Sequence, residues 1–300
     1  MVLGELVLCE LARRLSRTEV AHTSDMKASL KDADAYAGFR ESKARQHIFE
    51  AAARYDVSVR GRRVLDLGCF DGAISQVYLD EGATHVYGVD IDAAAIKRAR
   101  TNFTDPRLTF ETGTVSTIPL PDRCVDVVVS YDVFEHVSRI STILRELERV
   151  LTPGGTVLIG TWGWWHPFAP HLFSAMPVPW AHVVFSERTV LKACRRVYLS
   201  NWYQPTMHDF DDEGRRRPDK YTHTSISTDY LNKYLIRDFE RDFRASGLRH
   251  ETHLVPFGSR YARWTRPLLA VPMLREFLAG YVWFVLTKPG DAAATPQQVA

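Results

Sequence analysis

The residue types best suited to chemistry stand where two apolar segments of the sequence end. Residues 64–67 (Val-Leu-Asp-Leu) have the composition of a short buried strand, and Gly68 and Gly72 follow it, just before a helix-like segment. Glycine lets the backbone approach a ligand closely, and the first turn of a helix offers N–H groups to it. A second apolar strand at 86–89 ends in Asp90, whose carboxylate can accept hydrogen bonds from both hydroxyls of a ribose.

These residues resemble the cofactor site of the class I S-adenosylmethionine (SAM) dependent methyltransferases. Asp66-x-Gly68-x-Phe70-x-Gly72 is similar to the D/E-x-G-x-G-x-G loop of that family, with Phe70 in place of the middle glycine, a departure that the loop tolerates if Phe70 has a negative φ. A glycine loop alone is a weak signal, because NAD-binding proteins have a similar one. Further pieces keep the family's order: 112–122 resembles G-D-A-x-x-L-P-F-x-D, 125–128 resembles F-D-V-V, 133–137 resembles L-E-H-V, and 151–155 resembles L-K-P-G-G.

The resemblance implies SAM as the cofactor and assigns residues to it. Asp90 is expected to bind the ribose, because Asp92 already supplies a cap for the next helix, and Ile91 is expected to cover one face of the adenine. Thr114 stands where the family has an aspartate, so its backbone and that of Val115 are expected to meet the adenine. The cofactor set is Asp66, Gly68, Cys69, Gly72, Asp90, Ile91, Thr114, Val115 and Ser130, although Cys69 also suits a small packing position.

Two histidines are candidates for the chemistry of methyl transfer. The reaction is an in-line displacement that needs alignment of nucleophile, methyl group and sulfur. A hydroxyl nucleophile also needs a base, for which histidine is suited near neutral pH. His136 follows the fourth strand and is predicted to be that base, with Glu135 or Asp132 fixing its tautomer; orienting a helix start or a carboxylate is the alternative. His166, in a proline-containing turn with His171, is the second catalytic candidate.

A metal site is the alternative interpretation of the histidines. His166, His171, His182 and the pair His208-Asp209 offer enough nitrogen and oxygen ligands. Their spacing fits no metal signature, so the prediction is that no metal ion is bound and that these side chains form hydrogen bonds or pack.

From residue 62 onward, strand-like and helix-like segments alternate, which is typical of a parallel α/β sheet. We predict an α/β fold with a Rossmann-like, seven-stranded, mostly parallel sheet, helices on both faces, N-terminal helices and a cap inserted after the fifth strand. The ending resembles the antiparallel hairpin that inserts the family's last strand into the sheet. The predicted strands are 64–67, 86–89, 108–112, 125–130, 156–161, 248–256 and 281–287, and the predicted helices are 1–17, 36–55, 73–80, 93–102, 137–151 and 230–246.

The chain divides into five predicted regions. They are N-terminal helices with a cofactor lid (1–60), a SAM-binding core (61–161), a substrate cap (162–228), the C-terminal part of the core (229–288) and a disordered tail (289–300). The cap is predicted because this insertion is too long for an ordinary loop and holds five of the seven tryptophans. Two alternatives remain for Tyr36, Phe39 and Arg40 of the lid. Their side chains either face the cofactor site or simply pack against the protein or lie in solvent. The segment 259–280 is expected to pack against the sheet or a second subunit.

Composition argues against several classes of protein. A formal net charge of +2 gives no case for a polyanionic partner. The first residues lack the unbroken apolar run of a signal peptide, and no apolar run approaches the roughly 20 residues that cross a bilayer. Four widely spaced cysteines favour reduced thiols. We therefore expect a cytoplasmic monomer or homodimer with a small-molecule acceptor as its partner, no nucleic acid and no membrane span.

The predicted function is methyl transfer from SAM to a small molecule, at an oxygen of a partly apolar metabolite. The aromatic residues of the cap favour such an acceptor. An N- or C-methyltransferase, a methyltransferase acting on a macromolecule, and a SAM-binding protein without catalysis are the alternatives. No appended nucleic-acid module is evident. Intact Asp66, Gly68, Gly72 and Asp90 argue against the non-catalytic binding protein, whereas Phe70 and Thr114 keep that alternative open.

Overall fold

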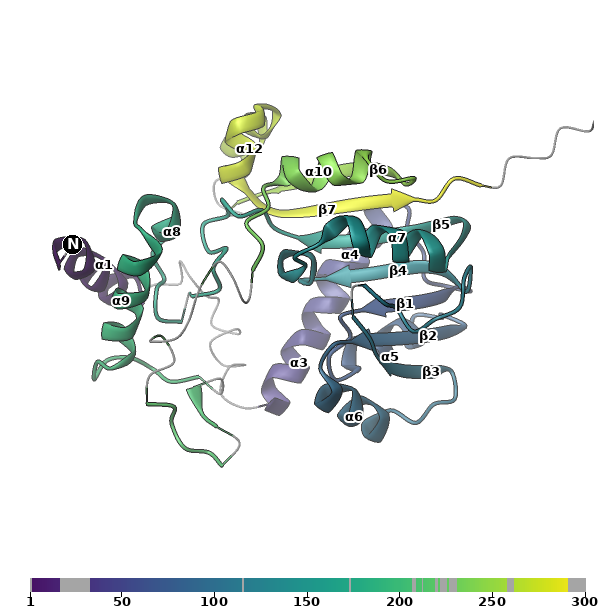
Figure 1. Cartoon of the computed structure of the whole chain (residues 1–300), viewed down its shortest axis with the longest axis horizontal. Coiled ribbons are helices and arrows are strands. Elements are labelled where there is room, and N and C mark those ends of the chain that lie inside the picture. The colour runs from purple at the N-terminus through teal and green to yellow at the C-terminus, as the bar shows by residue number, and fades with distance from the viewer. Residues whose placement is uncertain are drawn as a thin grey trace, which may run out of the picture.

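The computed structural model describes residues 2–16, 33–114, 116–172, 174–206, 209–211, 213–218, 221, 226, 231–257 and 262–290. A seven-stranded sheet of order β3-β2-β1-β4-β5-β7-β6 forms the larger part of the molecule (Figure 1). Its strands are β1 (Arg63–Leu67), β2 (His85–Asp90), β3 (Leu108–Thr112), β4 (Val125–Tyr131), β5 (Leu151–Thr161), β6 (Arg249–Pro256) and β7 (Ala279–Thr287).

The strand directions confirm the predicted fold class. Strands β1 to β5 run parallel, and β7 lies antiparallel between β5 and β6. The central strands form from unbroken apolar runs because a parallel sheet is covered on both faces, and Val127, Val128 and Val129 of β4 are all buried. Since parallel strands end at the same edge, the residues after β1, β2, β3 and β4 are brought together there.

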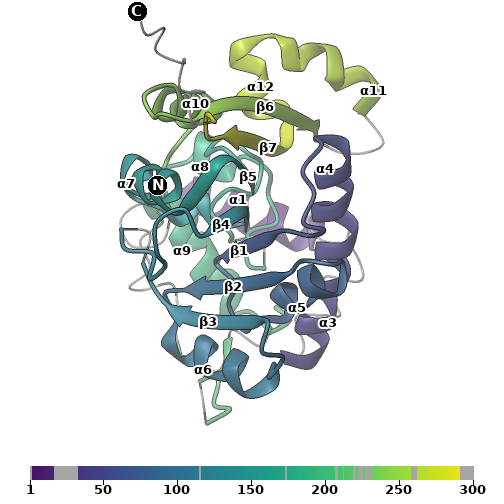
Figure 2. The ribbon, with the colours of Figure 1, turned by 90° about the vertical axis from the view of Figure 1, so that its right-hand side faces the viewer.

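Helices cover both faces of the sheet (Figure 2). One face packs against α7 (Ile140–Val150) and α10 (Ile236–Arg244), which bury Leu144, Leu147 and Phe239 in a shared apolar cluster. The predicted helix at 36–55 forms as a run of helical segments with one π-helical turn in the middle. The elements on the opposite face are α3 (Ala33–Lys43), η1 (Ala44–Ile48), α4 (Phe49–Arg54), α5 (Ala73–Asp80) and α6 (Ala93–Asn102).

Two element starts differ from the predicted ones by five residues or more. Strand β5 starts at Leu151 rather than at 156, because Leu151 already pairs with Val125 of β4 before a shift in register. Helix α10 starts at Ile236 rather than at 230. There the Asp238 carboxylate accepts a hydrogen bond from the Leu235 N–H, with an Oδ2–N distance of 2.9 Å, and so fixes the start of the helix.

A separate apolar cluster holds the cap together. It joins α1 (Val2–Leu15), through the buried Leu8 and Ala12, to α9 (Glu187–Tyr198), and α8 (Ala181–Val184) lies beside α9. Glu5 also pairs with Arg196 at 2.9 Å. The N-terminal helices therefore separate in space: α1 lies with the cap, whereas α3 to α4 cover the sheet (Figure 1). Of the predicted tail at 289–300, residues 291–300 lie outside the described residues.

Between β6 and β7 the chain forms α11 (Ala262–Thr265), η4 (Arg266–Ala270) and α12 (Pro272–Leu278). These three elements stand out from the β6–β7 end of the sheet (Figures 1 and 2). The buried Leu269 belongs to the apolar cluster of the sheet, while other apolar side chains of this segment are exposed. Among the described helices, none combines the length and the apolar character that crossing a bilayer requires.

Candidate active site

The loop after β1 takes the sharp turn that its glycines predict. Gly68 and Gly72 have φ values of 86° and 84°, in the left-handed region that residues with a Cβ rarely adopt. A Cβ on Gly68 would also collide with Val133, which precedes the helical turn after β4. The glycines thus allow both the turn and its close packing, and they bring the loop against the residues that follow β4.

Phe70 has a φ of 50°, so the condition of a negative φ, under which the replacement of glycine would be tolerated without strain, is not met. The loop keeps a left-handed residue at this position although glycine is replaced, at a cost of about 1–2 kcal/mol. Two contacts hold this conformation. The Phe70 N–H donates to Asp90 with an N–Oδ2 distance of 2.8 Å, and the Arg98 guanidinium lies 5.4 Å from the centre of the Phe70 ring. The strained residue therefore ties the loop after β1 to the acid after β2.

Asp90 stands at the end of β2 with its carboxylate fixed by backbone groups. Oδ2 accepts the bond from Phe70, and Oδ1 accepts one from the Asp92 N–H at 2.9 Å, so each oxygen retains a lone pair for a further donor. The Asp92 side chain caps α6, as predicted. Beside Asp90, the apolar Ile91 is 74% exposed. A carboxylate with acceptor capacity next to an uncovered apolar side chain fits the ribose and the adenine of SAM.

Three residues of the predicted cofactor set have buried side chains that shape the loop. Asp66 accepts a hydrogen bond from Ser75 of α5, with an Oγ–Oδ2 distance of 2.6 Å. Ser130 of β4 donates to the carbonyl of Leu67 at 3.3 Å. The Cys69 thiol is buried, as in the packing alternative. These side chains position the backbone that would meet the cofactor.

Thr114 follows β3 at the same edge as Asp90. The Gly113 N–H donates to the Asp90 carbonyl at 3.0 Å, which places Thr114 one residue from that contact, and its side chain is exposed. Val115, also assigned to the adenine, lies outside the described residues.

The predicted lid is described in part. Phe39 lies on α3 with the Lys43 Nζ atom 5.6 Å from its ring centre, a contact within the helix. The side chains of Tyr36 and Arg40 lie outside the described residues.

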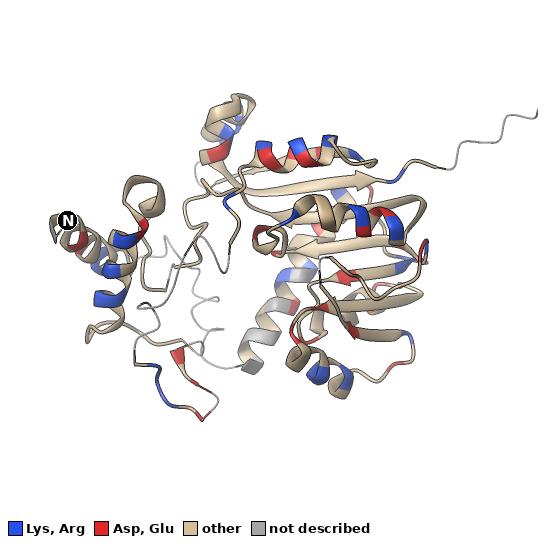
Figure 3. Cartoon of the chain, in the orientation of Figure 1, with Lys and Arg blue, Asp and Glu red and all other residues tan. Residues whose placement is uncertain are grey.

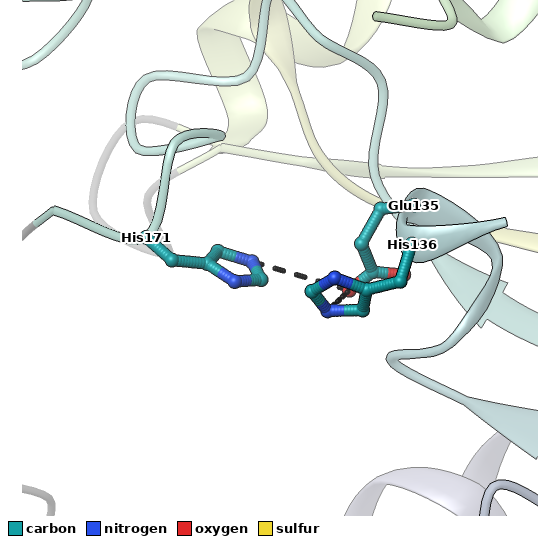
Figure 4. Close-up of side chains that lie close together, drawn as sticks. All are labelled: Glu135, His136 and His171. Carbon is teal, nitrogen blue, oxygen red and sulfur yellow. Dashed lines mark ion pairs between the residues drawn. The ribbon is translucent and has the colours of Figure 1, made fainter. Parts of the chain in front are cut away.

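Glu135, His136 and His171 come together at the carboxyl end of β4 (Figure 4). Glu135 and His136 belong to the short 3-10 helix η2 (Phe134–His136), and His171 comes from the cap. The Nε2 atoms of both histidines lie 4.0 Å from Glu135 Oε1, and the two ring centres are 5.3 Å apart. We call these three residues the histidine–glutamate cluster. It lies where the sheet and the cap meet.

Glu135 is buried, and hydrogen bonds fix one of its oxygens. Thr161 at the end of β5 donates to it, with an Oγ1–Oε2 distance of 2.8 Å. Within the described residues, Oε1 accepts no hydrogen bond and instead faces the two histidine rings (Figure 4). Burial raises the pKa of Glu135 from its ordinary 4.5 to about 7. Near neutral pH this carboxyl therefore exchanges a proton readily.

This raised pKa predicts that replacing Glu135 by glutamine stabilises the protein above neutral pH. The folded protein keeps a proton on Glu135 that the unfolded chain loses between pH 4.5 and about 7, so stability falls as pH rises through that window. The full effect is on the order of 3 kcal/mol, and the glutamine oxygen can still accept the Thr161 bond. Chemical unfolding at pH 8 should show most of this gain.

The same measurement near pH 4 should show little difference between the variant and the original protein, because there both states carry the proton. Glu251→Gln, at an exposed carboxylate of β6, is the matched control and should gain little at either pH. An equal gain at both pH values would contradict the assigned pKa.

Burial acts in the opposite direction on the buried histidines of the cap. It lowers the pKa of His166 and of His171 to about 3, and neighbouring histidines add to the effect. Both rings are thus neutral at neutral pH. His166 also stacks on Trp162, with ring centres 4.7 Å apart, and its Nδ1 accepts a bond from the Phe168 N–H. A histidine with so low a pKa is a weak base, which leaves the partly exposed His136 as the better candidate.

One carboxylate beside His136 is that of Glu135, whose Oε1 atom lies 4.0 Å from His136 Nε2. Asp132 accepts a hydrogen bond from the Tyr281 hydroxyl, with an Oη–Oδ1 distance of 2.7 Å. Glu135, one of the two acids considered from the sequence, is therefore placed to influence the His136 tautomer.

Asn232 holds the turn that carries the cluster, and sequence reasoning missed it. Its Nδ2 donates to the carbonyls of Phe134 and Val137 at 2.7 and 2.8 Å, and its backbone N–H donates to the carbonyl of Glu135 at 2.8 Å. Asn232 lies in a segment that the sequence pattern assigned to a helix. No local signal marks an asparagine that clamps a turn about one hundred positions earlier in the chain.

Among the described histidines considered as metal ligands, only His171 belongs to a group whose ligand atoms come close enough together for an ion. His182 Nε2 lies 2.8 Å from the Trp164 carbonyl, and Asp209 accepts a bond from the Tyr203 hydroxyl at 2.8 Å. His208 lies outside the described residues.

The histidine–glutamate cluster has the right residue types for a metal ion, and its ligand atoms lie within 4.8 Å of one another. Neighbouring ligands around a tetrahedral ion with bonds near 2.1 Å are roughly 3.4 Å apart. At the observed Nε2–Oε1 separations of 4.0 Å the cluster is wider than that. The three side chains would have to come closer together to hold such an ion.

Comparison with known proteins identifies the region that carries these features. Residues 65–159 match a family profile described as "Methyltransferase domain", a stretch that includes the glycine loop, Asp90 and the turn with Glu135 and His136. The chain carries a class I SAM-dependent methyltransferase domain. SAM is the cofactor of this domain, and the exposed Ile91 beside the acceptor oxygens of Asp90 fits it.

Relatives that match this region are also named as methyltransferases. A "Probable S-adenosylmethionine-dependent methyltransferase" from Mycolicibacterium smegmatis is 39% identical over 101 residues, which are 34% of this chain and 38% of that protein. An "Uncharacterized methyltransferase" from Mycobacterium bovis is 26% identical over 227 residues, 76% of this chain and 77% of the relative. The chain spans 38%, 45% and 55% of the length of three of the relatives that it matches.

A solved structure shows the same fold. A putative methyltransferase from Haloferax volcanii, solved in complex with a methyltransferase activator, matches with a TM-score of 0.50 and 20% identity. The match covers 87% of this chain and 97% of that one. It therefore includes most of the chain beyond the methyltransferase domain.

Proposed function

We propose that the chain is an enzyme that transfers the methyl group of SAM to a small-molecule acceptor, at an oxygen of a partly apolar metabolite. The observation that carries this proposal is the position of the histidine–glutamate cluster. Gly68 of the cofactor loop packs against Val133, two residues before Glu135. A group able to take a proton therefore lies next to the loop assigned to the cofactor.

The residues assigned to the cofactor divide into two roles. Asp90 would accept hydrogen bonds from the ribose hydroxyls, and Ile91 would cover the adenine. Asp66, Cys69 and Ser130 act from within the protein by holding the loop. Gly68 and Gly72 provide its turn, and Thr114 is exposed at the neighbouring strand end. This arrangement supports the residue set that the sequence predicted.

The proposed mechanism rests on the side chains of the cluster. SAM supplies an activated methyl group on a sulfonium sulfur. His136 takes the proton from the acceptor hydroxyl, and Glu135, with Oε1 at 4.0 Å from His136 Nε2, stabilises the imidazolium that forms. His171 and His166 stay neutral and shape the site. They therefore add no positive charge that would oppose protonation of His136.

Aromatic side chains beside the cluster support a partly apolar acceptor. The Trp162 ring lies 5.1 Å from His171 and 6.0 Å from Tyr281, measured between ring centres, with edge-to-face geometry in both pairs. Such rings offer apolar surface with limited conformational freedom. They face residues of the cluster, and so an acceptor held against them would lie near the base.

Trp162→Leu is therefore expected to raise the acceptor's KM by up to roughly tenfold, because an aromatic pair typically contributes about 0.5–1.5 kcal/mol beyond its buried area. The SAM dissociation constant should stay within a fewfold, since Trp162 contacts cap residues and Tyr281 rather than the loop after β1. Steady-state kinetics and calorimetry on the same preparation separate the two quantities. A weakened SAM affinity with an unchanged acceptor KM would contradict the role of Trp162.

The experiment that tests the function uses SAM labelled in its methyl group. The full chain is incubated with pools of hydroxyl-bearing metabolites, and in parallel with protein and RNA fractions. Label should enter the small-molecule pool as an ether or ester. Label in a macromolecule, or on nitrogen or carbon, would contradict the proposed acceptor. SAM binding without any transfer would indicate a non-catalytic binding protein.

We also propose a cytoplasmic location and a monomeric or homodimeric state. The location is supported by the cysteines, which are all free thiols, two of them buried. Thiols persist in reducing compartments.

A further inference from the structure

The segment 262–278, formed by α11, η4 and α12, is firmly held on its inner side. The buried Glu276 carboxylate accepts hydrogen bonds from the Ile236 and Arg237 N–H groups at the start of α10, at 2.7 and 3.1 Å. Arg275 pairs with Glu240 of α10, with an Nη1–Oε1 distance of 3.1 Å. The segment is thus fixed to the C-terminal part of the core.

Its inner side also meets the cap. Phe277 stacks on Trp165, with ring centres 4.5 Å apart and planes inclined by 23°. Trp165 directly precedes His166, whose ring lies 6.0 Å from that of Phe257 at the end of β6. The segment is therefore anchored beside the turn that carries part of the candidate active site.

The outer side of the segment is apolar and uncovered. Trp264 is 67% exposed and Met273 is 66% exposed. The segment is firmly anchored on its inner side and exposes apolar side chains on its outer side. This combination indicates that the outer side binds another surface. Its other exposed large apolar residues, all between 264 and 274, are Leu268, Val271 and Leu274.

Positive charge accompanies this apolar surface. Arg263 and Arg266 are exposed, and within the part of the chain that the structure describes neither pairs with a carboxylate. The Arg263 guanidinium lies 4.7 Å from the Trp264 ring centre. The sequence has no acidic residue from Phe257 to Arg275. In Figure 3, the red of an acidic residue appears on this protrusion only where it joins the sheet.

We propose that the segment 262–278 docks the protein on an anionic lipid membrane surface. Tryptophan favours the boundary between headgroups and acyl chains, leucine and methionine insert just below it, and arginine is attracted to anionic headgroups. All three kinds of side chain are present on one short, well-anchored protrusion. This inference goes beyond the proposed function and does not depend on it, because it concerns residues outside the candidate active site.

Charge distinguishes this occupant from a second copy of the chain. In a symmetric dimer each patch faces its own equivalent, so Arg263 and Arg266 of both copies would meet without carboxylates in the segment to pair with them. The negative charge of an anionic bilayer instead neutralises the positive charge of the arginines. Helix α1 also has an exposed apolar face, but its Arg13 and Arg14 pair with Glu10. Their positive charge is therefore already compensated within the helix, unlike that of Arg263 and Arg266.

The test measures sedimentation of the full chain with lipid vesicles. Vesicles of mixed phosphatidylcholine and phosphatidylglycerol should bind the protein at least roughly tenfold more tightly than vesicles of phosphatidylcholine alone, and added salt should weaken the binding. Trp264→Ser with Met273→Ser, and separately Arg263→Glu with Arg266→Glu, should each lower binding to the anionic vesicles by at least roughly tenfold.

The matched control is Leu3→Ser with Val184→Ser, which replaces side chains that are 75% and 73% exposed in the cap. It should bind vesicles like the original protein, and all variants should keep their unfolding temperature because the replaced side chains are exposed. Equal loss in the control, or no loss in the two test variants, would overturn the proposal. A dimer in solution that Trp264→Ser with Met273→Ser dissociates, without vesicle binding, would assign the surface to a second copy.

Discussion

Replacing His136 by glutamine is expected to lower kcat by roughly 10²- to 10⁴-fold, the usual contribution of a general base. Glutamine keeps much of the shape of the side chain but cannot accept the acceptor's proton at neutral pH. Assays with methyl-labelled SAM, quenched at fixed times, would measure the loss of kcat. Calorimetry should show nearly unchanged SAM affinity, because the contacts assigned to SAM come from the loops after β1, β2 and β3.

The pH dependence gives this prediction a second readout. Since His136 works as a base without its proton, kcat should rise with pH as the imidazole loses its proton. The variant should lose this rise. His85→Gln is the matched control, because His85 begins β2 and so lies at the opposite edge of the sheet. A normal kcat in His136→Gln, or a loss of stability alone, would make the histidine structural.

The second large effect is expected for Asp90→Ala. Removing the carboxylate deletes the hydrogen bonds assigned to the ribose hydroxyls, and bonds to charged groups contribute about 1.5–3 kcal/mol each. The SAM dissociation constant measured by calorimetry should therefore rise at least roughly tenfold. The variant also loses the contact that holds Phe70, so Asp90→Asn, which keeps one acceptor oxygen, should show a smaller loss.

Asp92→Ala is the matched control for Asp90. It removes an acid two residues away and the cap of α6, which should cost about 1 kcal/mol of stability. Its SAM affinity should stay within a fewfold of the original protein's. If Asp90→Ala folds and binds SAM normally, or if both variants lose affinity equally, Asp90 is not the ribose ligand.

Local patterns were enough to predict the sheet and the position of the cofactor loop. Buried parallel strands appear in the sequence as unbroken apolar runs, as in β4, and a glycine loop followed by an acid after the next strand marks one edge of the sheet. The insertion of β7 between β5 and β6 came from the family resemblance. Element boundaries were less predictable, because side chains such as Asp238 decide where a helix begins.

The parts that could not be predicted depend on contacts between distant segments. The conformation of Phe70 depends on a hydrogen bond to Asp90, twenty residues later. His171 joins Glu135 through the packing of the cap on the sheet, and α1 reaches the cap across most of the chain. Burial by several elements raises the pKa of Glu135. None of these contacts leaves a periodic or local pattern in the sequence.

The most direct measurement is a crystal structure of the full chain with S-adenosylhomocysteine, the product that remains after methyl transfer. We predict that the ribose hydroxyls bind Asp90, that the adenine lies against Ile91, and that the sulfur faces the histidine–glutamate cluster. A nucleoside bound away from Asp90, or a sulfur directed away from His136, would contradict the proposed active site.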